Sequence, residues 1–238
     1  MYEERFYRDY TLSQSRLEVS YKESDLLIST DTEVDKEFVQ SILKKYYEEI
    51  ERYIKKNPLF LTALCPIEDD KDAPPLVKEM ISSSHLSGIG PFSSVAGAIA
   101  HYVGKEILQY ASEVIVENGG DIFLKIDEDK RIGVYLGPRS KLKSLSLKIK
   151  KKSAPFGIAS SSSFFGHSLN LGRADLVTVI AKDAIIADGF ATALSNRIKR
   201  RQDVDEVLEY VKSSSLIEGL LVYFEEEVFL RGNLEIDT

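Results

Sequence analysis

The sequence predicts an α+β fold, because its strand-like and helix-like segments gather in separate runs. Polar and apolar residues alternate in two or three segments of residues 5–31 and in several segments of residues 113–181. Apolar residues with helical spacing fill the stretches before and after that central run. Of the 238 residues, 43% are hydrophobic, which is enough to bury one large core. We therefore expect a single domain spanning residues 1–238.

The N-terminal part predicts a strand meander followed by one long helix. Residues 6–12, 15–23 and 24–30 form the strand-like segments, with polar breaks between them. Residues 31–37 then offer Asp or Thr as a helix cap. In the helix expected next, the apolar positions that define one buried stripe are Phe38, Ile42, Tyr46, Ile50 and Ile54.

Two further helices are expected before the central strands. Residues 57–75 are irregular and punctuated by proline, and the pair Pro74 and Pro75 suits the start of a helix. The next helix follows the Gly/Pro turn at 88–91, and its first half consists almost wholly of small residues. Such residues allow another backbone, or a ligand, to approach the helix closely.

The central run predicts strands, and a helical pair and two final strands follow it. In residues 141–152, Leu145, Leu147 and Ile149 alternate with polar neighbours, and the lysines of the stretch are typical of an edge strand guarded by charge. A site for an anionic ligand is the alternative interpretation. The expected strands are 113–118, 121–127, 131–137, 144–150, 153–160 and 174–181; the expected helices are 182–201 and 203–214, and the final strands are 216–226 and 227–232.

Charge and cysteine content exclude several classes of protein. The net charge of −7 argues against a protein built to wrap nucleic acid. Cys65 is the one cysteine, so neither a disulfide framework nor a cysteine zinc site can form within this chain, and we expect it to be a small core residue. No signal peptide and no apolar run of membrane-spanning length is visible. We therefore expect a cytoplasmic protein without a membrane partner.

The first candidate site is a glycine turn. Asn118, Gly119, Gly120 and Asp121 separate two apolar runs, and Asn-Gly in that setting is a strong signal for a tight β-hairpin. A second glycine also suits a backbone that a ligand contacts closely, with the Asn and Asp side chains supplying hydrogen bonds beside it. Both interpretations remain open at this point.

The second candidate is the serine-rich stretch 160–170. Its hydroxyls, its glycine and His167 are suited to binding phosphate. They would also suit a Ser nucleophile with a His base, oriented by Asp175 or Asp188, although no nucleophile-elbow motif is present. A flexible loop with a surface histidine is the third interpretation.

The third candidate is a carboxylate and hydroxyl pair. Asp188 and Thr192 are four residues apart, so they share one face of the expected helix, among neighbours too small to shield them. Hard oxygen donors of this kind suit Mg²⁺. The alternative is an Asp that interacts with its own helix and a Thr that bonds a backbone carbonyl.

Taken in order, these signals resemble the ApbE superfamily, whose best-known members are FAD:protein FMN transferases. The stretches that carry the resemblance are GAIAHYVGKEIL (97–108), VENGGDIFL (116–124), GIASSSSFFGHSLN (157–170) and DLVTVIAKDAIIADGFATAL (175–194).

A second set of stretches is similar to one branch of that superfamily, the small, uncharacterised, non-exported ApbE-like proteins. With it the resemblance covers nearly the whole chain. The stretches in this second set are FYRDYTL (6–12), SDLLIST (24–30), PPLVKEM (74–80), GPFSSVAGAIA (90–100) and VENGGD (116–121).

The resemblance implies a fold of the T-fold type, with an antiparallel sheet backed by helices. It also implies a divalent metal, Mg²⁺, held by Asp188, Thr192 and the backbone carbonyl of Ala100, beside the diphosphate of FAD. In such transferases FMN passes to a protein Thr hydroxyl. The residues expected to line the cofactor are Asn118, Gly119, Gly120, Asp121, Ser160, Ser161, Ser162 and His167.

The chain departs from the transferase pattern at four places. No Met-Gly-Thr segment stands near the N-terminus, and the Lys of the small-residue helix is replaced by His101. The Asp that follows the loop histidine by three is Asn170, and Ser163 stands where Gly is usual.

These features lead to one expected function and two alternative functions. We expect a flavin- or nucleotide-like ligand bound with a divalent metal, with FMN transfer as a candidate activity. A non-catalytic ligand-binding or accessory protein in metabolism, such as sulfur assimilation, is the alternative, and a Ser/His hydrolase is the third. Because a T-fold sheet often completes itself in an oligomer, we expect a homodimer.

Overall fold

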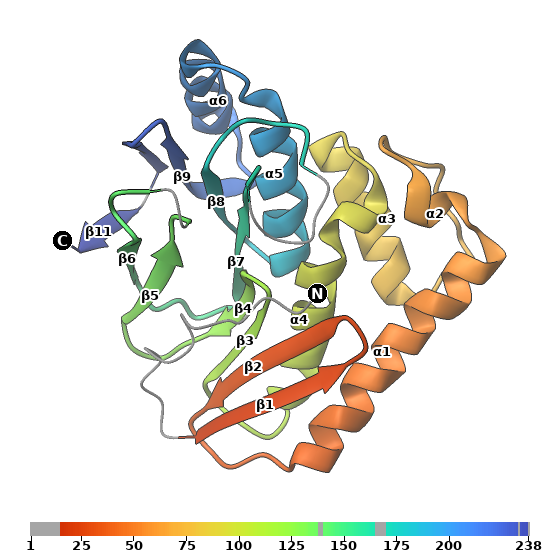
Figure 1. Cartoon of the computed structure of the whole chain (residues 1–238). Coiled ribbons are helices and arrows are strands. Elements are labelled where there is room, and N and C mark those ends of the chain that lie inside the picture. Colours follow the sequence, from red (N-terminus) through yellow and green to blue (C-terminus); the bar gives the residue numbers. More distant parts are fainter. Residues whose placement is uncertain (1–14, 138–139, 165–169, 233, 238) are drawn as a thin grey trace.

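A computed structural model describes residues 15–137, 140–164, 170–232 and 234–237 (Figure 1). Its largest element is an eight-stranded sheet in the order β1-β2-β3-β4-β7-β8-β9-β10, and all neighbouring strands are antiparallel. The strand expected at 6–12 lies outside the described residues. The strands of this sheet are β1 (Ser15–Tyr21), β2 (Ser24–Thr30), β3 (Val114–Asn118), β4 (Asp121–Lys125), β7 (Phe156–Ser161), β8 (Leu176–Ala181), β9 (Ile217–Phe224) and β10 (Glu227–Gly232).

Helices back one face of this sheet, which confirms the predicted α+β class (Figure 1). Helix α4 packs on β3 and β4, α5 packs on β7 and β8, and α6 packs on β9 and β10. Helix α1 contacts β1 and α4, and α3 contacts α5. The helices are α1 (Lys36–Lys56), α2 (Leu59–Thr62), α3 (Pro75–Ser87), α4 (Val95–Ile107), α5 (Ala184–Arg197) and α6 (Arg201–Ser213), with a 3₁₀ turn at Pro91–Ser94 before α4.

Helix α1 forms for the reasons that the sequence indicates. The Asp35 side chain accepts a hydrogen bond from the Glu37 backbone N–H at 3.1 Å and so caps the first turn. The expected stripe is buried in its middle, while Phe38 and Ile54 at its ends are only half-buried. The buried residues are Val39, Ile42, Leu43, Tyr46, Ile50 and Tyr53.

A three-stranded sheet in the order β11-β6-β5 covers the other face of the central strands. Its strands are β5 (Lys130–Tyr135), β6 (Ser144–Ile149) and β11 (Glu235–Asp237). The prediction that residues 141–152 form an edge strand was therefore wrong, because β6 lies in the middle. Glu235 pairs with Lys148 in the register and forms ion pairs with Lys148 and Lys150 at 3.6 and 2.7 Å. Two of the lysines that suggested an exposed edge are thus partners of the third strand.

Cys65 is exposed, so the expectation of a core cysteine was also wrong. The apolar run before it forms only one helical turn, α2, and a single turn buries a single side chain, Phe60. Leu59, Leu61 and Leu64 are 56%, 43% and 64% exposed. Apolar composition without a helical repeat was not enough to place this segment in the core.

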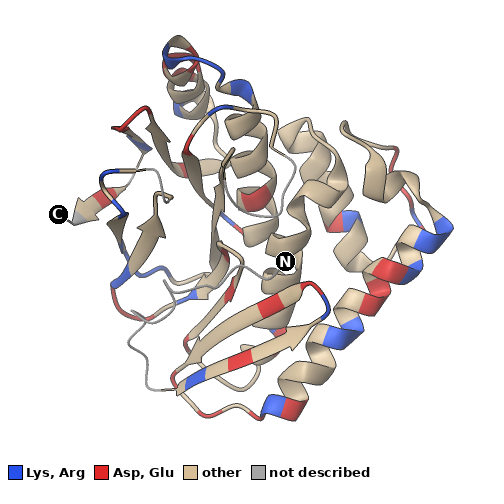
Figure 2. Ribbon diagram, viewed as in Figure 1, with Lys and Arg blue, Asp and Glu red and all other residues tan. Residues whose placement is uncertain are grey.

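Charged residues concentrate on the outer helices. Figure 2 shows α1 banded with both signs of charge, whereas α3, α4 and α5 carry few charged residues. This distribution fits the burial of α5, whose residues 184–195 are all buried. In the ranges that the structure describes, no helix has the length and apolar character needed to cross a membrane.

Candidate functional site

Three elements that are distant in sequence hold one peptide group of α4. The Gly97 N–H donates to the Asp188 carboxylate of α5 at 2.9 Å. The Asn118 side-chain amide, at the end of β3, donates to the Ala96 carbonyl at 3.2 Å. These carbonyl and N–H groups belong to the same peptide bond. The structure therefore brings the glycine turn, the small-residue helix and the Asp188 helix together.

Asp188 acts as an N-terminal cap of α4, although it belongs to another helix. The residue that precedes α4, Ser94, does not cap it and donates instead to the Pro91 carbonyl. The Gly97 N–H lies in the first turn, where α4 itself supplies no acceptor, and the Asp188 carboxylate accepts its hydrogen bond. Gly97 makes the approach possible, since a Cβ there would lie 2.3 Å from the Ala184 carbonyl oxygen.

The Asp188 carboxylate is buried without a compensating positive charge. Asp188 is 6% exposed, and no Lys, Arg or His among the described residues forms an ion pair with its carboxylate. Burial raises the pKa of Asp188 to about 7, while the Gly97 hydrogen bond opposes the rise. A divalent cation at this carboxylate would supply the missing charge, so the site fits a metal chemically.

Thr192 and Ser195 extend from Asp188 along one face of α5. They follow Asp188 by four and seven residues, so the three side chains form a stripe about 10 Å long. All three are buried. No group of three or more His, Cys, Asp or Glu side chains in the described ranges could hold a metal. Further ligands to a metal at Asp188 would have to be hydroxyls, carbonyls, water or the bound molecule.

The expected open patch around Asp188 was wrong. The small residues of α5 are buried against neighbouring elements, and Asp188 itself is buried among them. A Cβ on Gly189 would meet the Ser83 hydroxyl of α3 at 2.8 Å, and one on Gly157 of β7 would meet the Ala184 backbone at 2.3 Å. Close packing of the helix against α3, α4 and the sheet explains its composition.

The glycine turn is a tight hairpin between β3 and β4. Asn118 pairs with Asp121, and Gly119 and Gly120 have φ of +69° and +105°. A two-residue hairpin loop with both φ values positive is of type I′, which accounts for both glycines. The Gly120 N–H donates to the Glu117 carboxylate at 2.9 Å.

We expect Gly120→Ala to destabilise the protein by about 1–2 kcal/mol, because its φ of +105° is strained for any residue with a Cβ. A steric clash does not contribute to this loss of stability, since the nearest atom to the new Cβ would be 3.9 Å away. The matched control is Gly119→Asn, which should cost less, because Asn tolerates the left-handed region. Urea unfolding of both variants checks the prediction, and equal losses would contradict it.

Strand alternation divides the predicted serines between two faces of the sheet. Ser161 lies on the face that carries α5, where Asn170 links it to Ser195. Ser160 points to the opposite face, where its hydroxyl lies 2.9 Å from that of Thr178. Ser162 follows the strand and accepts a hydrogen bond from the Phe164 N–H at 3.1 Å. The three serines therefore do not form one cluster.

The other predicted residues are placed as follows. Asp121 shares the helix-facing side with Phe123, which packs against Gly104 of α4. Ala100 is fully buried inside α4, four residues beyond the Ala96 carbonyl that Asn118 contacts. His167 lies outside the described residues. Ala100 and His167 remain predictions.

Sequence reasoning did not assign a role to Asn170 or Ser195. Asn170 forms hydrogen bonds with side chains of both the serine segment and α5. The spacing of Ser195, seven residues after Asp188, is the signal that could have placed it on the same face.

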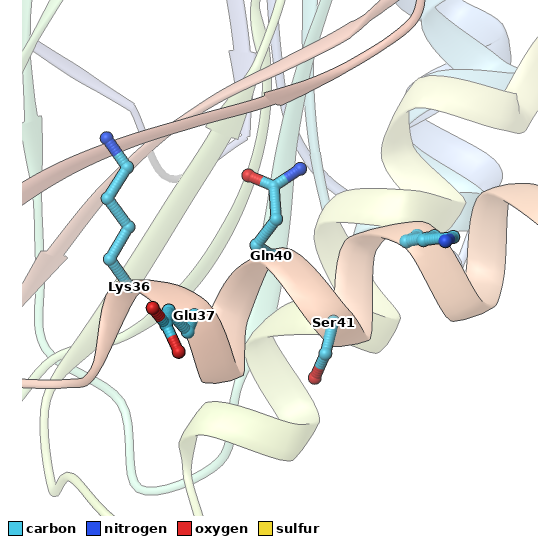
Figure 3. Close-up of a pocket in the computed structure, with 5 residues that line it drawn as sticks. Lys36, Glu37, Gln40 and Ser41 are labelled. Carbon is cyan, nitrogen blue, oxygen red and sulfur yellow. The ribbon is translucent and has the colours of Figure 1, made fainter.

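A surface depression lies elsewhere, on the first turns of α1 (Figure 3). All its lining residues belong to that one exposed helix, so it shares none with the candidate site. They are Lys36, Glu37, Gln40, Ser41 and Lys44.

The sequence is similar to a known protein family and to known proteins of archaea. The model of the family described as AbpE bacteria matches residues 8–215. A UPF0280 protein of Methanocaldococcus jannaschii is 36% identical, over 90% of this chain and 88% of its own. A UPF0280 protein of Archaeoglobus fulgidus is 35% identical, over 92% of each chain.

ApbE proteins are among the solved structures that share this fold. The apo form of the flavinyl transferase ApbE of Pseudomonas stutzeri has a TM-score of 0.62 and 14% identity, over 91% of this chain and 93% of that one. The H257G mutant of the flavin transferase ApbE of Vibrio cholerae has a TM-score of 0.59 and 16% identity, over 92% and 97%. The fold is thus of the ApbE type, as the sequence motifs predicted.

Proposed function

The chain belongs to the AbpE bacteria family within the ApbE superfamily, and from this membership and the site geometry we propose that it binds a flavin nucleotide together with a divalent metal. The observation that carries the proposal is the buried Asp188 carboxylate, which has no cationic partner among the described residues. A metal ion is the simplest group that would compensate its charge.

Asp188 and Thr192 would hold the metal, with the Ala100 carbonyl as the third predicted ligand. When bound, the metal would neutralise the pyrophosphate of the nucleotide. Asn118 keeps the first turn of α4 against the Asp188 carboxylate through the Ala96 carbonyl. This arrangement fixes the direction of the carboxylate before any ligand arrives.

Flavin transfer is the activity in the names of the structural relatives, and the sequence resemblance implies FMN as the transferred group. An acceptor hydroxyl would attack the phosphorus of the FMN half of FAD, the bond between the two phosphates would break, and AMP would leave while the hydroxyl proton is released. The acceptor is predicted to be a Thr of a protein partner.

A binding role without transfer is the second candidate, and His101 favours it. Lys is the pattern at this helix position, whereas the His101 ring lies edge-on to Phe123 and its Nδ1 is buried without a hydrogen bond among the described residues. Burial lowers the pKa of His101, so the ring is neutral at pH 7. The positive charge of the transferase pattern is therefore missing here.

We expect FAD to stabilise the protein only when Mg²⁺ is present, by about 3 kcal/mol at a ligand concentration near 100 times Kd. Thermal unfolding with FAD, FMN and ATP, each with and without Mg²⁺, measures this. Asp188→Asn should remove the magnesium dependence, and the exposed Asp205→Asn should keep it. No response of the folded protein to any nucleotide would contradict the proposal.

Release of AMP separates the two candidate functions. FAD incubated with Mg²⁺, the protein and a Thr-containing acceptor should yield AMP if transfer occurs. Magnesium-dependent binding without AMP release would support the non-catalytic role.

A further inference from the structure

We propose that Asn170 is a positioning residue that makes the Ser161 hydroxyl a hydrogen-bond donor to a phosphate oxygen of the ligand. The inference deepens the proposed function and rests on it for the identity of the ligand. It depends on the direction of the hydrogen bonds around Asn170.

The side chain of Asn170 uses its full hydrogen-bonding capacity. Its Nδ2 donates to the Ser161 hydroxyl at 3.0 Å and to the Ser195 hydroxyl at 2.7 Å. Its Oδ1 accepts from the Gly172 N–H at 2.8 Å and from the Ser163 hydroxyl at 3.1 Å. Because a backbone N–H can only donate, the Gly172 contact identifies Oδ1 and therefore fixes which atom faces Ser161.

This orientation determines what the Ser161 hydroxyl can do. Its oxygen accepts a hydrogen bond from Asn170 Nδ2, so its own O–H is available to donate to another acceptor. In the described part of the chain, the Ser161 hydroxyl has no hydrogen-bond acceptor. An oxygen of an ionised phosphate only accepts hydrogen bonds, so it would be a suitable acceptor for the Ser161 O–H.

Two neighbouring serines form hydrogen bonds with other side chains. Ser160 is paired with Thr178 on the far face of the sheet. The Ser163 hydroxyl donates a hydrogen bond to Asn170 Oδ1. Ser161, by contrast, combines an O–H that is available to donate with a place on the face of α5.

The position of Ser161 relates it to the candidate metal site. Asn170 joins it to Ser195, which ends the stripe that begins at Asp188 and passes through Thr192. The metal ligands would hold one part of a diphosphate, and Ser161 would bind an oxygen towards the other end of the stripe.

The amide of Asn170 is essential to this role. The transferase pattern has Asp at this position, and a carboxylate offers no donor to either hydroxyl. In an Asn170→Asp variant, the Ser161 hydroxyl would donate a hydrogen bond to the new carboxylate. It would then face the phosphate as an acceptor, and the added negative charge would repel the ligand.

The test is titration calorimetry with two probes, FAD and inorganic pyrophosphate, both with Mg²⁺. Ser161→Ala and Asn170→Asp should each weaken binding by about tenfold to a hundredfold, because a hydrogen bond to a charged group is lost. The double variant should bind no worse than Asn170→Asp, since both changes remove the same contact. Ser163→Ala is the matched control and should stay within threefold, because Gly172 still orients the amide.

The two probes separate failure of the inference from failure of the proposed function. Pyrophosphate binding that depends on Ser161 and Asn170, without FAD binding, would support the inference and contradict a flavin ligand. FAD binding that Ser161→Ala leaves unchanged would overturn the inference and keep the proposed function. Binding of neither probe by the folded protein would overturn both. If Asn170→Asp fails to fold, Ser161→Ala decides alone, because it removes only one hydroxyl.

Discussion

At pH 8 and without divalent metal, Asp188→Asn should be more stable than the wild-type protein by up to about 4 kcal/mol. The reason is the burial of the carboxylate, which raises its pKa from the ordinary 3.8 to about 7. The neutral amide retains an oxygen that can accept from the Gly97 N–H and avoids the cost of burying a charge.

The pH dependence of this effect has a definite direction. Below about pH 4 the carboxyl is protonated in both the folded and the unfolded chain, so it imposes no cost. As the pH rises from about 4 to about 7, the unfolded chain loses this proton more readily than the folded chain, and the folded state loses stability. Above about pH 7 the full cost is present. The variant should lack this decline between pH 4 and pH 7.

Urea unfolding across that pH range measures the effect, with Asp205→Asn as the control. Asp205 is an exposed carboxylate that pairs with Arg201, so its substitution should leave the decline in place. Added Mg²⁺ should raise the stability of the wild-type protein and leave Asp188→Asn unchanged. A wild-type protein at least as stable as the variant at pH 8 without metal would show that the carboxylate is already compensated.

Gly97→Ala should destabilise the protein by about 3 kcal/mol or more, because the new methyl group would overlap with backbone. Its Cβ would lie 2.3 Å from the Ala184 carbonyl oxygen and 2.8 Å from the Asp188 Cβ. Neither atom can move without shifting α4 against α5. The shift would also disturb the hydrogen bond between the Gly97 N–H and Asp188.

The control for this variant is Gly133→Ala, in β5. A Cβ at that position would meet no atom within 4 Å, so the change should be neutral or slightly stabilising. Chemical unfolding of both variants gives the comparison. A loss below about 1 kcal/mol for Gly97→Ala would mean that the two helices can separate cheaply.

The fold was predictable where a pattern repeats along the chain. The four-residue spacing of apolar side chains located α1, and the Asn-Gly pair located the hairpin between β3 and β4. The place of β6 was not predictable, because its second neighbour, β11, comes from the other end of the described chain. Local alternation shows that a strand has a buried face but not which strands lie beside it.

Two of the predicted site residues lie together in the structure, whereas their roles stay predictions. Motif order brought Asn118 and Asp188 into one hypothesis, and both contact the same peptide of α4. The exposure of Asp188 could not be inferred, because small neighbours are equally suited to an open patch and to tight helix packing. The separation of Ser160 from Ser161 follows from strand alternation, once the end of β7 is known.

The late position of β11 in the chain has a consequence for folding. During synthesis, β6 can pair with β5 long before residues 235–237 emerge, so one backbone edge of β6 stays without a partner in that period. The inward side chains Leu145, Leu147 and Ile149 would make such an edge prone to association with other chains. Lys148 and Lys150, which later pair with Glu235, place like charges along it and would keep nascent chains apart. The same lysines would thus oppose aggregation first and join the finished sheet afterwards.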